Sequence, residues 1–281
     1  MVDVRDWSEL PIMRSNCALE LRSLAVALML AGDCHPTRAT ENEVGGPRGV
    51  GLVMLDLEGL MDIEMAIVSK RSESVREAPA SVAVLTAEDI RRSGATSIPE
   101  ALRFVPGLNV YQHNPGVWSI GVRGFNEVMA NKLLVLVDGR SVYSPMFAGV
   151  FWDVQDTVLE DIKRIEIIRR PRATVWGANA VNGVINIVTE SARETQGTMV
   201  SATGGSEIHG MFAVRYGGRL SENLFFRLYG KYFDRDNHRL ADGSGSPDGY
   251  FQSRGGLRLD WHPSETGHYT LQGELYGGRF D

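Results

Sequence analysis

The sequence predicts an α+β domain with a small mixed sheet, followed by about five long antiparallel strands. Between residues 78 and 195, short β-rich runs such as Leu133–Val137 and Ile165–Arg169 alternate with helix signals and with Gly or Pro turns. After Gln196 the runs become longer, alternate strictly between apolar and polar residues, and are separated by Gly, Asp and Ser turns. We therefore expect the architecture to change near residue 196.

The α+β domain begins near Ala78 with a strand at Ser81–Leu85 and a well-marked helix start. Thr86 is placed as the N-cap of a helix over Ala87–Arg92, and Asp89 stands where a capping box usually has Glu or Gln. Gly94 ends this helix. The remaining predicted elements are a helix at Ser97–Arg103 with Pro99 in its first turn, strands at Leu108–Gln112 and Ser119–Val122, an Asp138-Gly139 turn, a helical turn at Gln155–Asp161 and a β-run at Gly183–Thr189.

The strands after residue 196 each have one apolar and one mixed face. In Leu224–Phe233, one face carries Phe225, Arg227, Tyr229, Lys231 and Phe233, and the other carries Leu224, Phe226, Leu228 and Tyr232. Leu257–His262 and Tyr269–Leu275 alternate in the same way. This pattern is typical of transmembrane barrel strands and equally of a soluble antiparallel sandwich. Because a closed barrel needs about eight strands or more, we expect an incomplete barrel from a fragment or a truncated gene product.

Composition excludes several classes of function. A net charge of −6 and a pI near 5.6 argue against a nucleic-acid partner. The two cysteines, Cys17 and Cys34, form neither a disulfide framework nor a metal site, and the six histidines are scattered. No residue pattern supplies an activated nucleophile, so we expect no enzyme, no catalytic residue, no metal and no cofactor. No apolar run of about 18 residues exists that could form a transmembrane helix.

The first residues suggest export. Residues 1–34 are predicted to be a signal or targeting segment, because the apolar run Leu24–Ala31 follows Arg14 and Arg22. A lipid anchor at Cys34 and a plain amphipathic segment are the alternatives. A start at Met13 gives a cleaner signal. Residues 35–77 are mixed in composition and predicted to be a linker.

A series of motifs then follows a family order. They are Ala78–Val82, Glu88–Ala95, Glu100–Leu102, Val105–Leu108, Ile120–Phe125 (IGVRGF), Val137–Gly139, Glu166–Arg169 and Ala180–Ile187 (AVNGVINI). Together they resemble the plug domain of TonB-dependent outer-membrane receptors, and the resemblance covers residues 55–281. It implies a plug at 78–195 that gates a transmembrane β-barrel, of which 196–281 form the first strands. It also implies the Gram-negative outer membrane, with its lipid, as location, and import of a scarce ligand such as a ferric siderophore or cobalamin.

The resemblance also assigns roles to residues. A TonB box, which pairs with the periplasmic energising protein by β-augmentation, is assigned to Ile63, Glu64, Met65, Ala66, Ile67, Val68 and Ser69. Ligand contacts are assigned to outward plug loops through His113, Asn114, Trp118, Asn126, Asn131, Tyr143 and Phe147. The plug's structural motif comprises Arg123, Gly124, Asp138, Gly139, Trp176, Gly177, Asn182 and Gly183. One departure is that Arg170 and Arg172 stand where the family often has glycine.

Several alternatives accompany this interpretation. A non-transporting truncated remnant and a periplasmic plug-like binding module are the competing functions. Trp152 is expected in the plug core rather than at a ligand. Arg123 and Asp138 are expected to pair within the plug or with charges of the barrel wall, and the polar stretch Asp234–Tyr250 is expected to be an outward loop.

Overall fold

The computed structural model describes residues 64–65, 73–74, 82–129, 131–169, 176–177, 179–264 and 267–280. These belong to one compact unit, Val50–Asp281. The predicted signal segment, Arg170 and Arg172 lie outside the described residues, and so does the TonB-box candidate apart from Glu64 and Met65. Those two form β1 (Glu64–Met65), which pairs antiparallel with β2 (Glu73–Ser74).

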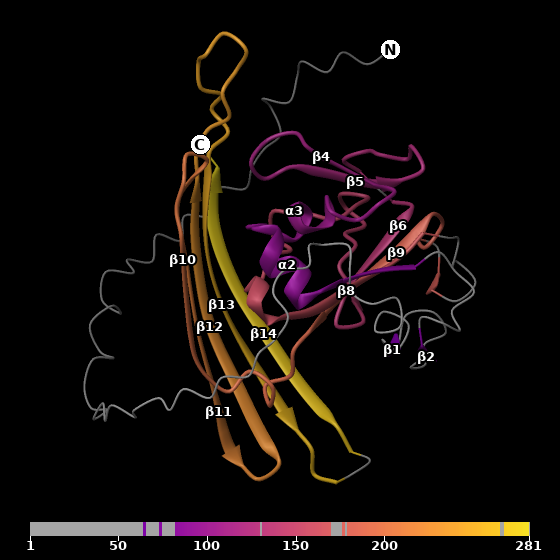
Figure 1. Cartoon of the computed structure of the whole chain (residues 1–281), viewed down its shortest axis with the longest axis vertical. Coiled ribbons are helices and arrows are strands. Elements are labelled where there is room, and N and C mark those ends of the chain that lie inside the picture. Colours follow the sequence, from indigo (N-terminus) through magenta and orange to yellow (C-terminus); the bar gives the residue numbers. More distant parts are fainter. Residues whose placement is uncertain are drawn as a thin grey trace, which may run out of the picture. The chain divides into compact units, whose positions relative to one another are not determined.

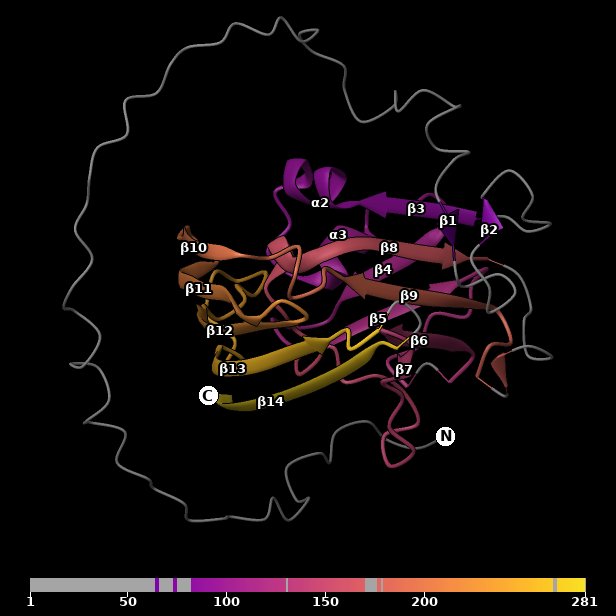
Figure 2. The same ribbon diagram turned by 90° about the horizontal axis from the view of Figure 1, so that it is seen from below.

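A five-stranded mixed sheet is the centre of the α+β domain, as predicted (Figures 1 and 2). In spatial order its strands are β3 (Val82–Thr86), β8 (Ile162–Ile168), β9 (Gly183–Thr189), β6 (Leu133–Val137) and β7 (Arg140–Ser141). Only β6 and β9 run parallel; the other pairs are antiparallel. Both faces of the sheet are covered: Leu133 and Val135 enter one apolar cluster, while Leu134 and Leu136 enter another. Burial on both faces explains the nearly continuous apolar runs.

The helices begin where their caps predict. α2 (Ala87–Ser93) has a complete capping box: the Thr86 side chain accepts the N–H of Asp89 at 3.2 Å, and the Asp89 carboxylate accepts the N–H of Thr86 at 2.9 Å. Asp therefore replaces Glu here without loss of the motif. The helix ends at Gly94, whose φ of 68° is left-handed. The other elements are α3 (Ile98–Leu102), the hairpin of β4 (Leu108–Gln112) and β5 (Trp118–Val122), and the 3-10 turn η2 (Leu159–Asp161).

The helical turn predicted over Gln155–Asp161 is wrong for its first half. Only η2 is helical, and residues 154–157 are irregular. The physical reason is competition for carbonyl groups. The carbonyl oxygens of Val154, Asp156 and Thr157 accept hydrogen bonds from Arg254 and Lys231 of the second sheet, which satisfy them without a helix.

The second sheet, which we call the wall, has five antiparallel strands in sequence order (Figure 1). They are β10 (Gly197–Thr203), β11 (Ile208–Ser221), β12 (Leu224–Arg235), β13 (Tyr250–Trp261) and β14 (Tyr269–Phe280). The predicted alternation is present: Arg227 and Lys231 are buried on the inward face, which packs on the α+β domain, whereas Leu228 and Tyr232 are exposed on the other. β13 begins at Tyr250 rather than Leu257. Among the described residues, no helix is both long and apolar enough for a membrane span.

Candidate functional site

The inward face of the wall carries a row of cations. Strand alternation places them on one side of β11, β12 and β13; they are Arg215, Arg227, Lys231, Arg235, Arg254 and Arg258. Four of the six are buried, between 5% and 8% exposed. A buried cation is costly unless it is paired or hydrogen-bonded, so each must find a partner on the α+β domain.

Three carboxylates of the α+β domain supply partners. Asp161, at the end of η2 and 1% exposed, binds Arg215 and lies 3.4 Å from the Nε of Arg227. Asp156 lies 2.8 Å from the Nζ of Lys231. Glu100 of α3 lies 3.2 Å from Arg235. Each pair joins residues far apart in sequence.

Backbone carbonyl groups complete the contact. Arg254 donates to the carbonyl oxygens of Val154 and Asp156, and Lys231 donates to that of Thr157 at 2.9 Å. Arg227 donates to the carbonyl oxygen of Glu190 at 2.9 Å. The α+β domain therefore contacts this part of the wall through fixed dipoles as well as through charges.

Glu100 illustrates the electrostatics of the contact. Burial alone would raise the pKa of its carboxyl. The backbone N–H of Thr96, the charge of Arg235 and hydrogen bonds from both side chains outweigh burial, so the pKa of Glu100 falls below its ordinary value. The carboxylate is therefore ionised at neutral pH, as its pairing with Arg235 requires.

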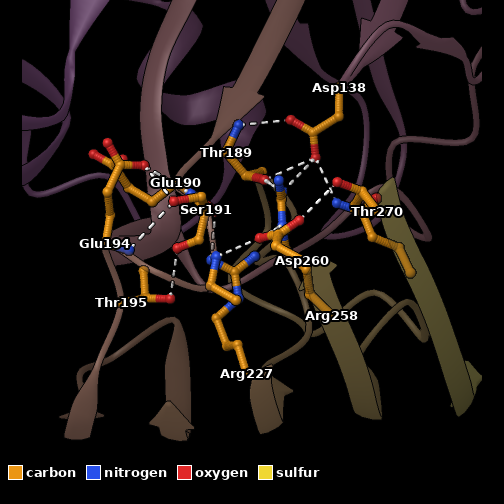
Figure 3. A network of polar contacts seen from close by, with 12 residues as sticks. Asp138, Thr189, Glu190, Ser191, Glu194, Thr195, Arg227, Arg258, Asp260 and Thr270 are labelled. Atoms are coloured by element: carbon orange, nitrogen blue, oxygen red, sulfur yellow. Dashed lines mark hydrogen bonds and ion pairs between the residues drawn. The ribbon is translucent and has the colours of Figure 1, made fainter. Parts of the chain in front are cut away.

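A second network lies where the α+β domain leads into the wall (Figure 3). Asp138, in the β6–β7 turn, accepts the N–H of Thr189 at 2.8 Å and its hydroxyl at 2.7 Å. Arg258 donates to Thr189 at 2.9 Å and to Asp260 at 2.8 Å. Asp260 in turn accepts the hydroxyl of Thr270 at 2.7 Å. The network links the ends of β6 and β9 to β13 and β14.

The segment between β9 and β10 is held by a compact turn. The carboxylate of Glu194 accepts the N–H and hydroxyl of Ser191 at 2.9 and 2.8 Å, and also binds Lys163 of β8 at 2.6 Å. Burial opposes ionisation of Glu194, but the hydrogen bonds from Lys163 and Ser191 prevail and lower its pKa to about 2. The connection between the two sheets is therefore ordered by charged hydrogen bonds.

The residues of this interface position the two sheets relative to each other. Among the residues that the structure describes, no group of three or more His, Cys, Asp or Glu side chains could hold a metal ion. The interface holds two sheets together through contacts that water can also make.

Of the predicted ligand residues, the structure brings two together. The ring Nε2 of His113 lies 3.1 Å from the hydroxyl of Ser119, and the amide of Asn126 donates to the same hydroxyl at 3.2 Å. His113 is exposed, and the Oδ1 atom of Asn126 is buried with no hydrogen-bond partner. Asn114 instead shapes a turn, because its side chain accepts the N–H groups of Gly116 and Val117.

The other predicted ligand residues are dispersed. Trp118 does not face outward as expected: it is 4% exposed in the main apolar cluster, with Arg103 stacked 5.0 Å from its ring. A large apolar ring on a hairpin over the sheet is more favourably buried. Phe147 stacks on Phe151 with ring centroids 4.2 Å apart, Tyr143 is partly buried and Asn131 is exposed. Trp152, expected in the core, lies in the same cluster as Trp118.

The predicted structural motif includes several strained or tight backbone positions. Arg123 and Gly124 both have positive φ, and Arg123 donates to the carbonyl oxygen of Arg169 at 2.8 Å. Asp138 and Gly139 also have positive φ.

At Gly183 an added Cβ would lie 2.4 Å from the carbonyl oxygen of Ile168, so no larger residue fits. Trp176 packs against the smaller apolar cluster; Gly177 has a φ of 95°; and the N–H of Asn182 donates to the carbonyl oxygen of Lys132.

Two features were not predicted from the sequence: the partners of the wall cations, and an aromatic group beside the predicted ligand loop. Tyr250 stacks on Phe280 with centroids 4.7 Å apart, and the ring of Phe280 approaches Gly116 so closely that a Cβ there would lie 2.8 Å from it. The signal for the cations was available, because Arg227 and Lys231 share one face of an alternating strand. No sequence pattern indicates which acids meet them.

Comparisons with known proteins agree with this architecture. A sequence model described as TonB-dependent Receptor Plug Domain matches residues 74–184. The ferric enterobactin receptor of Pseudomonas aeruginosa is 31% identical over 198 residues, which cover 62% of this chain and 26% of that protein.

Two solved structures share the fold. The ferric yersiniabactin uptake receptor FyuA of Yersinia pestis superposes with a TM-score of 0.58 at 20% identity, covering 77% of this chain and 33% of that one. The ferric-catecholate import receptor Fiu of E. coli does so with a TM-score of 0.59 at 18% identity, covering 78% and 30%.

The fold and its interface define a plug domain joined to barrel-type strands. Residues 74–184 therefore match the plug domain of TonB-dependent receptors, and the fold of the chain is similar to part of these receptors. Its relatives are receptors rather than enzymes, as the sequence predicts. The chain spans about a third or less of the length of these relatives.

Proposed function

We propose that this chain functions as a TonB-dependent receptor of the Gram-negative outer membrane, in which the plug gates a β-barrel containing β10–β14. The observation that carries the proposal is the row of wall cations, whose partners are plug carboxylates and carbonyl groups. Water can replace such partners, whereas separating two apolar surfaces would cost about 25 cal/mol per Å² exposed. A polar contact therefore suits a plug that must move. We also propose domain boundaries at 78–195 for the plug and 196–281 for the barrel strands.

The outer face of the wall supports a membrane location. Five large apolar residues on it are 51–83% exposed: Val200, Phe212, Val214, Leu271 and Leu275. A periplasmic plug-like binding module would leave this face in water, where such a patch promotes association. Lipid is the better solvent for it. This observation favours the receptor over the binding module.

We propose a ferric siderophore as the ligand, because the relative at 31% identity is a ferric enterobactin receptor. Cobalamin is the competing ligand. The test is uptake of ⁵⁵Fe-labelled enterobactin and of ⁵⁷Co-labelled cobalamin by cells that lack their own receptors and express this gene. We expect iron uptake that requires the TonB-type energising protein. Uptake of cobalamin instead of iron would identify cobalamin as the ligand. Binding without energised uptake would support the non-transporting remnant.

We propose Ile63–Ser69 as the TonB box. The antiparallel pairing of β1 with β2 supports this, since a segment that pairs as a strand can accept the strand of a partner. Met65→Pro removes a backbone donor from this segment and is expected to abolish uptake while ligand binding persists. Met65→Ala is the matched control and is expected to transport normally. Unchanged uptake in the proline variant would place the box elsewhere.

A further inference from the structure

Two carboxylates, one from each domain, approach the side chain of Arg258 (Figure 3). Asp260, on the same wall strand, accepts from the Nε of Arg258 at 2.8 Å. Asp138, in the plug, lies 3.5 Å from its NH1 atom. Arg258 therefore has a close ion pair within the wall, whereas on the plug side it has a longer ion pair with Asp138 and a hydrogen bond to Thr189 at 2.9 Å.

The contact at Asp260 is dry. Its side chain is 3% exposed and accepts the backbone N–H of Ala192 at 2.6 Å and the hydroxyl of Thr270 at 2.7 Å. Ala192 lies in the segment that connects β9 to β10. Breaking its bond would leave a buried carboxylate without one of its donors, which is costly. Asp260 therefore fixes the segment through which the chain passes from the plug to the wall.

The contact at Asp138 is accessible to water. Its side chain is 21% exposed and borders a cavity of about 430 Å³, together with Thr189, Arg258 and Gln272; Asp260 does not border this cavity. Gln272 donates to Asp138 at 3.1 Å. Asp138 also keeps two hydrogen bonds from Thr189 inside the plug. If plug and wall part here, Asp138 keeps Thr189 and Arg258 keeps Asp260, so neither charge loses every partner.

We propose that Asp138 and Asp260 are positioning residues with different roles in gating. The Asp138 contact with Arg258 and Gln272 is a releasable clasp, and the Asp260 contact with Ala192 is a fixed anchor about which the plug turns. This inference rests on the proposed function only in assuming that the plug moves. It concerns where plug and wall separate first, and it can be tested without ligand or energising protein.

The experiment measures two distances by electron–electron double resonance in the full chain in detergent, with Cys17 and Cys34 replaced by Ser. One label pair, Arg140→Cys with Leu275→Cys, reports the clasp side. The other, Arg193→Cys with Tyr269→Cys, reports the anchor side. All four positions are exposed. Raising NaCl from 0.05 to 1 M perturbs the unsubstituted interface, because salt screens accessible charges far more than buried ones.

Asp138→Asn removes the clasp charge but keeps a residue type that tolerates the φ of 48° found there. We expect both this variant and high salt to increase, at least about threefold, the population with a longer clasp-side distance. The anchor-side distance should stay unchanged. Asp260→Asn is expected to broaden the distance distribution of the anchor-side pair. Glu222→Gln, in the exposed β11–β12 turn, is the control and should change neither.

Equal changes at both pairs, or no change at the clasp pair in either perturbation, would overturn the inference. So would an unchanged anchor pair in Asp260→Asn. The proposed function is judged separately, by energised uptake in cells. A receptor that transports but shows no clasp therefore refutes this inference alone.

Discussion

The interior of the plug is held together by apolar contacts, whereas its contact with the wall is polar. In the interior, Ile165, Ile185 and Ile187 are fully buried and form part of one apolar cluster. At the wall, the buried groups include Asp161 and Lys231, held by ion pairs and hydrogen bonds. The apolar core stabilises the plug itself. The polar contact holds the plug in a defined position through hydrogen-bond and ion-pair partners that water can replace.

The difference agrees with the proposed function, in which the plug moves relative to the wall while its core stays folded. Apolar burial is non-directional and scales with area, so an apolar plug–wall contact would resist any displacement. Ion pairs and hydrogen bonds are directional and depend on salt and on access to water. Variants at the water-accessible ion pairs of the interface should therefore respond to salt, whereas variants in the apolar core should not.

The largest expected effect is at the interface. Asp161→Ala removes the partner of Arg215 and one partner of Arg227, and is expected to lower the free energy of unfolding by about 3–5 kcal/mol. Urea unfolding of the detergent-solubilised chain, followed by tryptophan fluorescence, measures it. Replacing all three residues by Leu or Met should recover most of the loss. A triple variant as unstable as Asp161→Ala would show that the charges themselves stabilise the contact.

A core truncation should cost nearly as much but respond differently. Ile165→Ala leaves a cavity in the sheet and is expected to lower the free energy of unfolding by about 2–5 kcal/mol. Because no charge is involved, the difference from the parent chain should be the same at 0.05 and 1 M NaCl. The same unfolding assay at both salt concentrations is the measurement. A loss that shrinks with salt would contradict the proposed separation of core and interface.

A smaller effect is expected at the cap of α2. Thr86→Ala removes the side-chain acceptor for the N–H of Asp89 and should cost about 1 kcal/mol. Thr86→Ser keeps the hydroxyl and is the matched control, expected to lie near the parent chain. Equal losses in the two variants would mean that the methyl group, rather than the cap, matters. The measurement is again the urea midpoint.

Local features of the plug could be predicted because their causes are local. The capping box at Thr86, the stop at Gly94 and the β-run Gly183–Thr189 each depend on neighbouring residues, and the structure confirms all three. The irregular segment at residues 154–157 could not be predicted, because its carbonyl groups are used by Lys231 and Arg254.

The candidate site was less predictable than the fold. Alternation placed Arg227 and Lys231 on one face, but their partners come from η2 and a loop about 70 residues away in sequence. The burial of Trp118 was missed because a short hairpin strand does not reveal which face meets the core. Pairings over such separations depend on tertiary packing, which no local pattern encodes.

The smallest effect concerns pH and the turn between plug and wall. The folded pKa of Glu194 is about 2, below its ordinary 4.5, so this group stabilises the fold above pH 4.5 and loses that contribution as pH falls toward 2. Its side chain is 46% exposed, so solvent limits the expected contribution to about 0.5–1 kcal/mol. Glu194→Gln should therefore be less stable than the parent at pH 7 and nearly equal to it at pH 2, in urea midpoints measured at both values. Glu222→Gln provides the control for loss of one exposed charge, and a Glu194→Gln deficit that persists at pH 2 would mean that packing, not ionisation, orders the turn.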